Sequence, residues 1–85
     1  MILKIYSLFD SKLGAYMAPM YFHSRGQAIR SIVDEAGRVD SPLHNHPGDF
    51  TLFELGDWND SNSRFIPLDT PHSCGVISEL LAPVS

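Results

Sequence analysis

The sequence predicts a small α+β domain: an antiparallel sheet in the order ββαββ plus a C-terminal tail, with one amphipathic helix packed on one face. Residues 2–9 and 50–58 are runs of aliphatic and aromatic residues, which are typical of central strands. Residues 25–36 have the apolar spacing of a helix. Since 85 residues leave room for one core, we expect a single domain over residues 1–85.

The first hairpin is predicted from a strand, a turn and a second strand. Residues 2–9 place apolar side chains on both strand faces, and residues 10–14 have turn chemistry. Gly14 in this turn can adopt a positive φ. Residues 16–23 resume strand-like composition. Pro19 has no amide donor, so this second strand is expected at a sheet edge or at a bulge.

The helix is predicted over residues 25–36, with a start signal before it. Ser24 and Gln27 fit a capping box, in which the serine accepts from the helix and the glutamine reaches back. Arg30 and Asp34 are spaced to form a weakly stabilising i,i+4 pair on the polar face.

The second half of the chain predicts another hairpin. Residues 50–58 form its first strand, residues 59–63 a polar turn, and residues 64–68 the antiparallel partner. Proline and polar residues at 69–73 are expected to break the chain again. Residues 76–81 form a short last element, strand or helical turn, which periodicity leaves open.

The strand composition has a consequence for assembly. One helix covers one sheet face, yet both central strands are apolar on two faces. The second face must therefore be covered by the C-terminal tail or by another copy of the protein. We expect a homo-oligomer, with coverage by the tail as the alternative.

Charge restricts where nucleic acid could bind. The net charge is -4, but residues 1–38 carry a balance of +2 and residues 39–85 a balance of -6. Aromatic platforms beside basic groups on a sheet bind single-stranded DNA, whereas the plainer alternative makes these aromatics core or cross-strand pairs. The candidate nucleic-acid-binding residues are Lys4, Lys12, Tyr16, Tyr21, Arg25 and Arg30.

The remaining candidates are four metal-ligand types: His44, His46, His72 and Cys74. Two close pairs could converge on a zinc ion, but the spacing differs from the common finger patterns, so we expect no metal. A thiolate pair of Cys74 with His72 is conceivable, yet no catalytic motif accompanies it. We therefore expect a non-enzymatic protein without a cofactor.

The cysteine content and the lengths of the apolar runs predict the cellular location. The lone cysteine excludes an intrachain disulfide and fits a reducing compartment. No apolar run approaches the roughly 20 residues of a membrane-spanning helix, and the N-terminal residues lack the features of a signal peptide. We expect a cytoplasmic protein without membrane contact.

Two phrases carry a resemblance to a known family. Residues 5–19 read IYSLFDSK-x-GAY-x-x-P, and residues 45–60 read NHP-x-DF-x-LF-x-LG-x-W-x-D. Together with the Ala-Ile-Arg run at 28–30, they resemble the small nonstructural protein of gokushoviruses, the tailless single-stranded DNA phages of the Microviridae. The similarity covers about residues 1–70; His44, His72 and Cys74 lie outside its phrases.

The resemblance implies a phage accessory protein, made in the host cytoplasm, that assists single-stranded DNA genome replication or packaging. Such proteins are commonly labelled nonstructural or DNA-binding, which implies single-stranded DNA and phage replication or capsid-assembly proteins as partners. The alternative is a protein-interaction or scaffolding module that never contacts DNA. The acidic second half suits a basic protein partner at least as well as the first half suits DNA.

Overall fold

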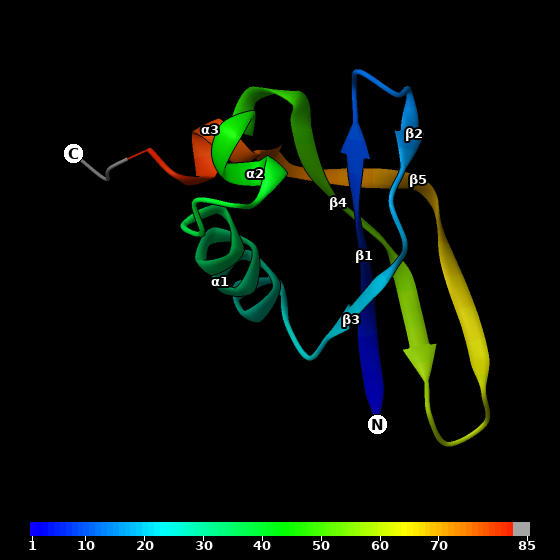
Figure 1. The fold of residues 1–85 in the computed structure, drawn as a ribbon. Helices are drawn as coiled ribbons and strands as arrows, with labels where there is room; N and C mark the ends of the chain where they lie inside the picture. Colours follow the sequence, from blue (N-terminus) through cyan, green and yellow to red (C-terminus); the bar gives the residue numbers. More distant parts are fainter. Residues whose placement is uncertain (83–85) are drawn as a thin grey trace.

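Five strands form one antiparallel sheet in this computed structural model, which describes residues 1–82 (Figure 1). Its order is β2 (Ala15–Tyr16), β1 (Ile2–Asp10), β4 (Phe50–Asn59) and β5 (Arg64–Val76). The fifth strand, β3 (Met20–Phe22), pairs with β1 on the same side as β2. The predicted α+β class, with a main helix on an antiparallel sheet, is confirmed.

The first hairpin follows the sequence prediction closely. Gly14 has φ 67°, the left-handed conformation that its turn requires. The predicted strand over residues 16–23 is present as β2 and β3, and Pro19 lies between them at the edge of the sheet. A missing amide donor is tolerated there because no further strand pairs with that edge.

Helix α1 (Arg25–Ala36) has the predicted bounds. Ser24 Oγ accepts from the backbone N–H of Gln27 at 3.2 Å, as expected of the cap. Gln27 Oε1, however, accepts from the backbone N–H of His23 at 2.7 Å, one residue earlier than a standard capping box. The loop that follows contains two short helices, α2 (Pro42–Asn45) and η1 (Pro47–Asp49).

Strand β5 corrects the sequence prediction. It continues through residues 69–73, where we expected a break, and ends only at Val76. The register explains how the prolines fit: Gly56 pairs with Pro67 and Glu54 with His72, so residues 68–71 bulge outward opposite a single residue of β4. Because β5 is an edge strand, this bulge and its prolines disrupt no further pairing.

The last element is helical. Helix α3 (Ile77–Leu80) follows β5 directly, which resolves the alternative left open over residues 76–81. Ile77 is fully buried and belongs to the main core cluster. The chain through Ala82 therefore returns to the side of the sheet that α1 already covers.

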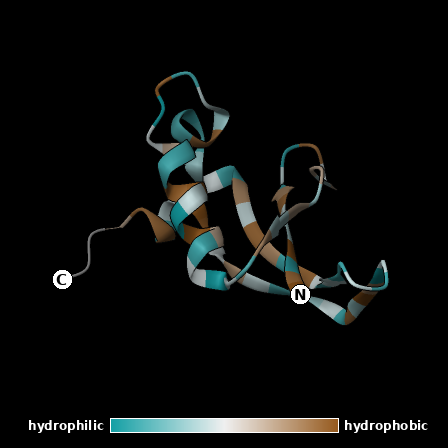
Figure 2. Cartoon of the chain, turned by 90° about the horizontal axis from the view of Figure 1, so that it is seen from below, coloured by the Kyte–Doolittle hydropathy of each residue, from teal (hydrophilic) through white to brown (hydrophobic). Residues whose placement is uncertain are grey.

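The core lies between one sheet face and a layer of helices that we call the helical layer: α1, α2, η1 and α3. Figure 1 shows these helices gathered on one side of the strands. Alternate side chains of β1 and of the first half of β4 point toward this layer. The buried cluster consists of Tyr6, Leu8, Phe50, Leu52 and Cys74 from the strands and Ala28, Ile32, Ala36, Leu43 and Ile77 from the helical layer. The opposite sheet face carries apolar residues too, and Figure 2 shows hydrophobic residues on the strands as well as on the helices.

Gly56 allows β4 and β5 to approach each other at the irregular part of their pairing. Its φ is 156°, and a Cβ there would lie 2.8 Å from Pro67 Cα and collide with the Ile66 carbonyl. No other residue type fits this position without displacing β5 backbone. Gly56 therefore determines how the second hairpin bends.

Candidate interaction surfaces

The sheet face opposite the helical layer is rich in aromatic residues, and we call it the aromatic face. In an antiparallel pair, residues opposite each other in the register share a face, so the strand pairing assigns its members. Tyr16 lies opposite Phe9, Tyr21 opposite Ile5, Trp58 opposite Leu3, and Phe65 opposite Trp58. The aromatic face consists of Phe9, Tyr16, Tyr21, Phe53, Trp58 and Phe65.

Three of these rings form a cluster at one end of the sheet. The ring centroids of Phe9 and Tyr16 are 5.0 Å apart, those of Tyr16 and Phe53 5.6 Å, and those of Phe9 and Phe53 6.4 Å. All three contacts are edge-to-face, the geometry that ring quadrupoles favour. Tyr16 remains 47% exposed, so the cluster presents a ring to solvent.

A second aromatic pair lies toward the other end of the sheet. Trp58 and Phe65 have centroids 4.6 Å apart, and Phe65 is 60% exposed. Tyr21, which is 42% exposed, lies between the two groups in the register, opposite Ile5. Exposed aromatic surface of this extent is typical of an interaction site.

The aromatic face carries no formal charge at any position that the strand register assigns to it. On β1 it presents Leu3, Ile5, Ser7 and Phe9, and on β4 it presents Thr51, Phe53, Gly56 and Trp58. The charged residues of these two strands, Lys4 and Asp57 among them, lie on the opposite face of the sheet.

Lys4, the first cationic candidate, is on the side of the helical layer and is already neutralised. Its Nζ lies 3.8 Å from a carboxylate oxygen of Glu54 and 3.8 Å from one of Asp57. Two carboxylates surround one ammonium, so Lys4 offers little attraction to a phosphate group.

The remaining candidates are divided between the two layers. Arg25 and Arg30 belong to α1, in the helical layer, whereas Tyr16 and Tyr21 lie on the aromatic face. Lys12 is exposed in the turn that joins β1 to β2. Tyr16 and Tyr21 therefore share the aromatic face, whereas Lys4, Arg25 and Arg30 lie on the side of the helical layer.

The four metal-ligand candidates do not converge. Within residues 1–82, no three His, Cys, Asp or Glu side chains are close enough to hold a metal ion. His44 Nδ1 lies 3.0 Å from the Ala36 carbonyl oxygen, while His46 ends α2 and His72 is exposed on β5. Cys74 is buried in the core of the helical side.

Cys74 and Tyr6 are buried titratable groups, and both are held neutral. Burial raises the pKa of the Cys74 thiol, the opposite of what a nucleophilic thiolate requires. Burial, reinforced by the nearby Glu54 carboxylate, raises the pKa of Tyr6 to about 12. The Tyr6 hydroxyl has no hydrogen-bond partner within the described part of the chain.

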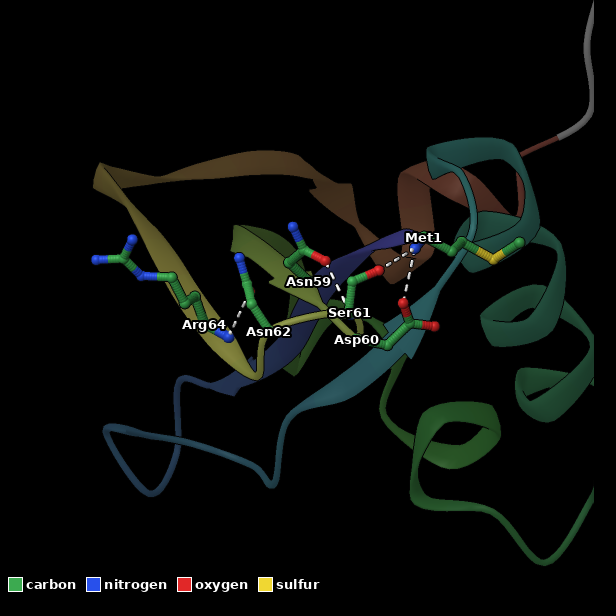
Figure 3. A network of polar contacts seen from close by, with 6 residues as sticks. All are labelled: Met1, Asn59, Asp60, Ser61, Asn62 and Arg64. Atoms are coloured by element: carbon green, nitrogen blue, oxygen red, sulfur yellow. Dashed lines mark hydrogen bonds and ion pairs between the residues drawn. The ribbon is translucent and has the colours of Figure 1, made fainter.

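The start of β1 is fastened to the turn between β4 and β5 by polar contacts (Figure 3). The Met1 ammonium donates to Asp60 Oδ1 at 2.7 Å and to Ser61 Oγ at 3.3 Å. This hydrogen bond to the amino terminus lowers the pKa of the Asp60 carboxyl. The contacts are fully exposed, so they define the end of the sheet rather than a site.

A cleft lies on the opposite side of the molecule from the aromatic face. It has a volume of about 670 Å³ and is bounded by the second half of α1, by α2, and by the segment from the β1–β2 turn to Met20. We call it the helix–hairpin groove. Its apolar lining comprises Leu8, Leu13, Met17, Met20, Ile32, Pro42, Leu43 and Phe50, and its polar lining Asp10, Ser31, Asp34, Glu35, Arg38 and Ser41.

Sequence reasoning found the aromatic face in part and did not find the groove. The alternation along residues 2–9 and 50–58 indicated two apolar faces, which is the signal for Phe9 and Phe53. It placed Trp58 on the face of Phe50 and Leu52, which is wrong, because the register shift between Glu54 and Gly56 turns Trp58 to the aromatic face. The groove residues Leu13 and Met17 lie in irregular segments without periodicity, so no pattern indicated them.

Comparison with known proteins places the chain in a family. Residues 3–80 match the Phage ORF5 protein family. Because the match spans nearly the whole chain, the protein belongs to that family. Searches of curated proteins and of solved structures gave no match. No helix within residues 1–82 is long and apolar enough to cross a membrane.

Proposed function

We propose that this phage protein is a non-enzymatic accessory factor of a gokushovirus-like single-stranded DNA phage that assists genome replication or packaging in the host cytoplasm. Its mode of action is protein–protein contact through the aromatic face, beginning with a second copy of itself. The open, uncharged aromatic face is the observation that carries this proposal. The similarity of residues 5–19 and 45–60 to gokushovirus nonstructural proteins supports a role in genome replication or packaging.

A second copy suits the aromatic face for a physical reason. The protein carries a net charge of -4, so copies repel each other unless they meet on neutral surface. The aromatic face is such a surface. A twofold-symmetric contact between two aromatic faces would bury the exposed Tyr16 and Phe65 rings of both copies. The position of α3 favours a second copy over the tail, because Ile77 and Leu80 pack into the core on the helical side.

Single-stranded DNA is the second candidate for this face. Tyr16 is half exposed, and Lys12 lies in the turn of the same hairpin; exposed rings combined with cations are the arrangement on which bases stack. A nonspecific DNA groove also needs several unpaired cations, and Lys4 is neutralised by Glu54 and Asp57. The charge distribution therefore favours the protein contact.

Sedimentation velocity at micromolar concentration tests the proposal. The wild-type protein is expected to sediment as a dimer or larger species, and Phe65→Ser combined with Tyr16→Ser as a monomer. Val39→Ser is the matched control, because Val39 is 77% exposed but lies between α1 and α2. A monomeric wild-type protein at these concentrations would overturn the self-association.

Oligo(dT) binding distinguishes the two candidates. Binding that falls steeply between about 50 and 200 mM salt and is lost in Lys12→Glu would establish the DNA contact instead. Self-association through an apolar face is expected to change little over the same salt range. In infected cells, the double variant is expected to lower the ratio of single-stranded to double-stranded phage DNA, and an unchanged ratio would contradict the assigned stage.

A further inference from the structure

The helix–hairpin groove is a second surface that the proposed function does not use. It lies between the helical layer and the first hairpin, whereas the aromatic face is on the opposite side of the sheet. Its volume of about 670 Å³ falls in the range of ligand-binding clefts. Nothing within residues 1–82 fills it.

The bottom of the groove is formed by core side chains. Leu8, Ile32, Leu43 and Phe50 line it and also belong to the buried cluster. These residues are held by packing on several sides, so the groove has a rigid apolar floor that exists before any ligand binds.

The hairpin wall of the groove is apolar and adaptable. Leu13 is 79% exposed and Met17 48% exposed, although both border the groove. Methionine has an unbranched and polarisable side chain that adjusts to irregular apolar partners. A wall of this kind fits an incoming apolar side chain rather than a polar small molecule.

The rim of the groove is acidic. Asp10, Asp34 and Glu35 contribute three carboxylates and Arg38 one cation. Arg38 is itself neutralised, because its guanidinium lies 3.5 Å from Glu35 and 3.7 Å from Asp40. The sequence predicted an Arg30–Asp34 pair, but no ion pair of Asp34 is present within residues 1–82. Asp34 is exposed at the rim, and the groove repels anions such as nucleic-acid phosphates.

We infer that the helix–hairpin groove binds a short basic segment of a protein partner, in which apolar side chains alternate with lysine or arginine. The apolar side chains enter between the rigid floor and Met17, and the cations lie against Asp34 and its neighbours on the rim. Charge complementarity selects this occupant over DNA and over a second acidic copy of the chain. The inference is independent of the contact proposed for the aromatic face.

Methionine methyl NMR tests the groove directly, because the chain has three methionines. Met17 and Met20 line the groove, and Met1 lies at the opposite end of β1 beside Asp60, so it is an internal control. The probe is a short synthetic peptide of leucine and lysine in amphipathic order. We expect the Met17 and Met20 methyl signals to shift and saturate while the Met1 signal stays unchanged.

Two peptide controls define the chemistry. Replacing leucine by serine keeps the charge, and replacing lysine by glutamate keeps the apolar residues; both changes are expected to abolish saturable shifts. Equal binding of the serine peptide would overturn the inference in favour of nonspecific charge attraction. Saturable shifts of the same methyl groups on addition of oligo(dT) without peptide would assign the groove to DNA and likewise overturn it.

Two matched pairs of variants locate the site on the protein. Asp34→Lys is expected to weaken the peptide by roughly tenfold at low salt, whereas Asp69→Lys, which makes the same exposed change on β5, leaves it nearly unchanged. Leu13→Ser is expected to weaken it, and Val39→Ser is not, although both side chains are similarly exposed. Equal effects within either pair, or no shift with any peptide, would contradict the groove as the binding site.

Discussion

The two faces of one sheet differ in what covers them. On the helical side, Leu52 is fully buried by α1, α3 and their neighbours. On the other side, Phe53 packs against Phe9 and Tyr16, and no helix covers the rings as far as Ala82. Apolar residues occur on both faces of β1 and β4, so apolar pattern alone does not distinguish a core from an interface. Coverage does, and the helical residues come from elsewhere in the chain.

The largest effect is expected from a change that destabilises the whole sheet, and therefore both of its faces. Gly56→Ala places a Cβ against Ile66 and Pro67 backbone at a φ that alanine rarely adopts. Backbone strain and overpacking together should cost about 4 kcal/mol of unfolding free energy. Urea unfolding followed by tryptophan fluorescence measures this cost, with Gly48→Ala as the control, because a Cβ there meets nothing within 4 Å. Equal stability of the two variants would show that the close approach is not formed.

Adjacent residues on opposite faces sharpen the comparison. Leu52→Ala leaves a cavity in the covered core and should cost about 3 kcal/mol of unfolding free energy. Phe53→Ala removes a partly exposed ring, so it should cost about 1 kcal/mol in the monomer while abolishing self-association. Denaturation at low protein concentration separates the two quantities. Equal costs in the monomer would mean that the aromatic face is as closed as the core.

A smaller effect than the loss of the Leu52 side chain comes from the Tyr6 hydroxyl on the covered face. Its pKa is raised from 10.0 to about 12, so Tyr6 ionises at a lower pH in the unfolded chain than in the folded one, and the unfolding free energy falls as the pH rises from 10 toward 12. That loss is on the order of 2 kcal/mol. Tyr6→Phe should remove this alkaline loss and, by deleting an unpaired buried hydroxyl, raise stability near neutral pH by about 1 kcal/mol. Tyr21→Phe on the exposed face is the control variant. The same dependence of stability on alkaline pH in Tyr6→Phe and in the wild-type protein would refute the role given to the Tyr6 hydroxyl.

Local signals predicted most of the fold. Ser24 and the apolar spacing after it mark the start of α1, and Gly14 marks the first turn, because both depend on neighbours in the sequence. The full length of β5 was not predicted, because Pro71 normally interrupts a strand. It is tolerated only since β5 is an edge strand with a bulge, which depends on the sheet order.

The candidate site was predicted less well for the same reason. Tyr16 and Tyr21 do lie on the open face, but the state of Lys4 depends on its register partner Asp57, far along the chain. Arg25 and Arg30 are separated from the tyrosines by the layer in which α1 lies. Which charges remain free is a property of long-range pairing, and single-sequence patterns do not contain it.

The pairing of β1 with β4 also affects how the chain folds during translation. Ile2 pairs with Asn59, so β1, which is synthesised first, cannot complete its pairing until β4 has left the ribosome. Until then β1 can pair only with the short strands β2 and β3. Pairing with β4 also requires closing the long intervening segment, which costs conformational entropy. Until β4 has been made, the apolar side chains of β1 therefore remain open to contacts with other chains.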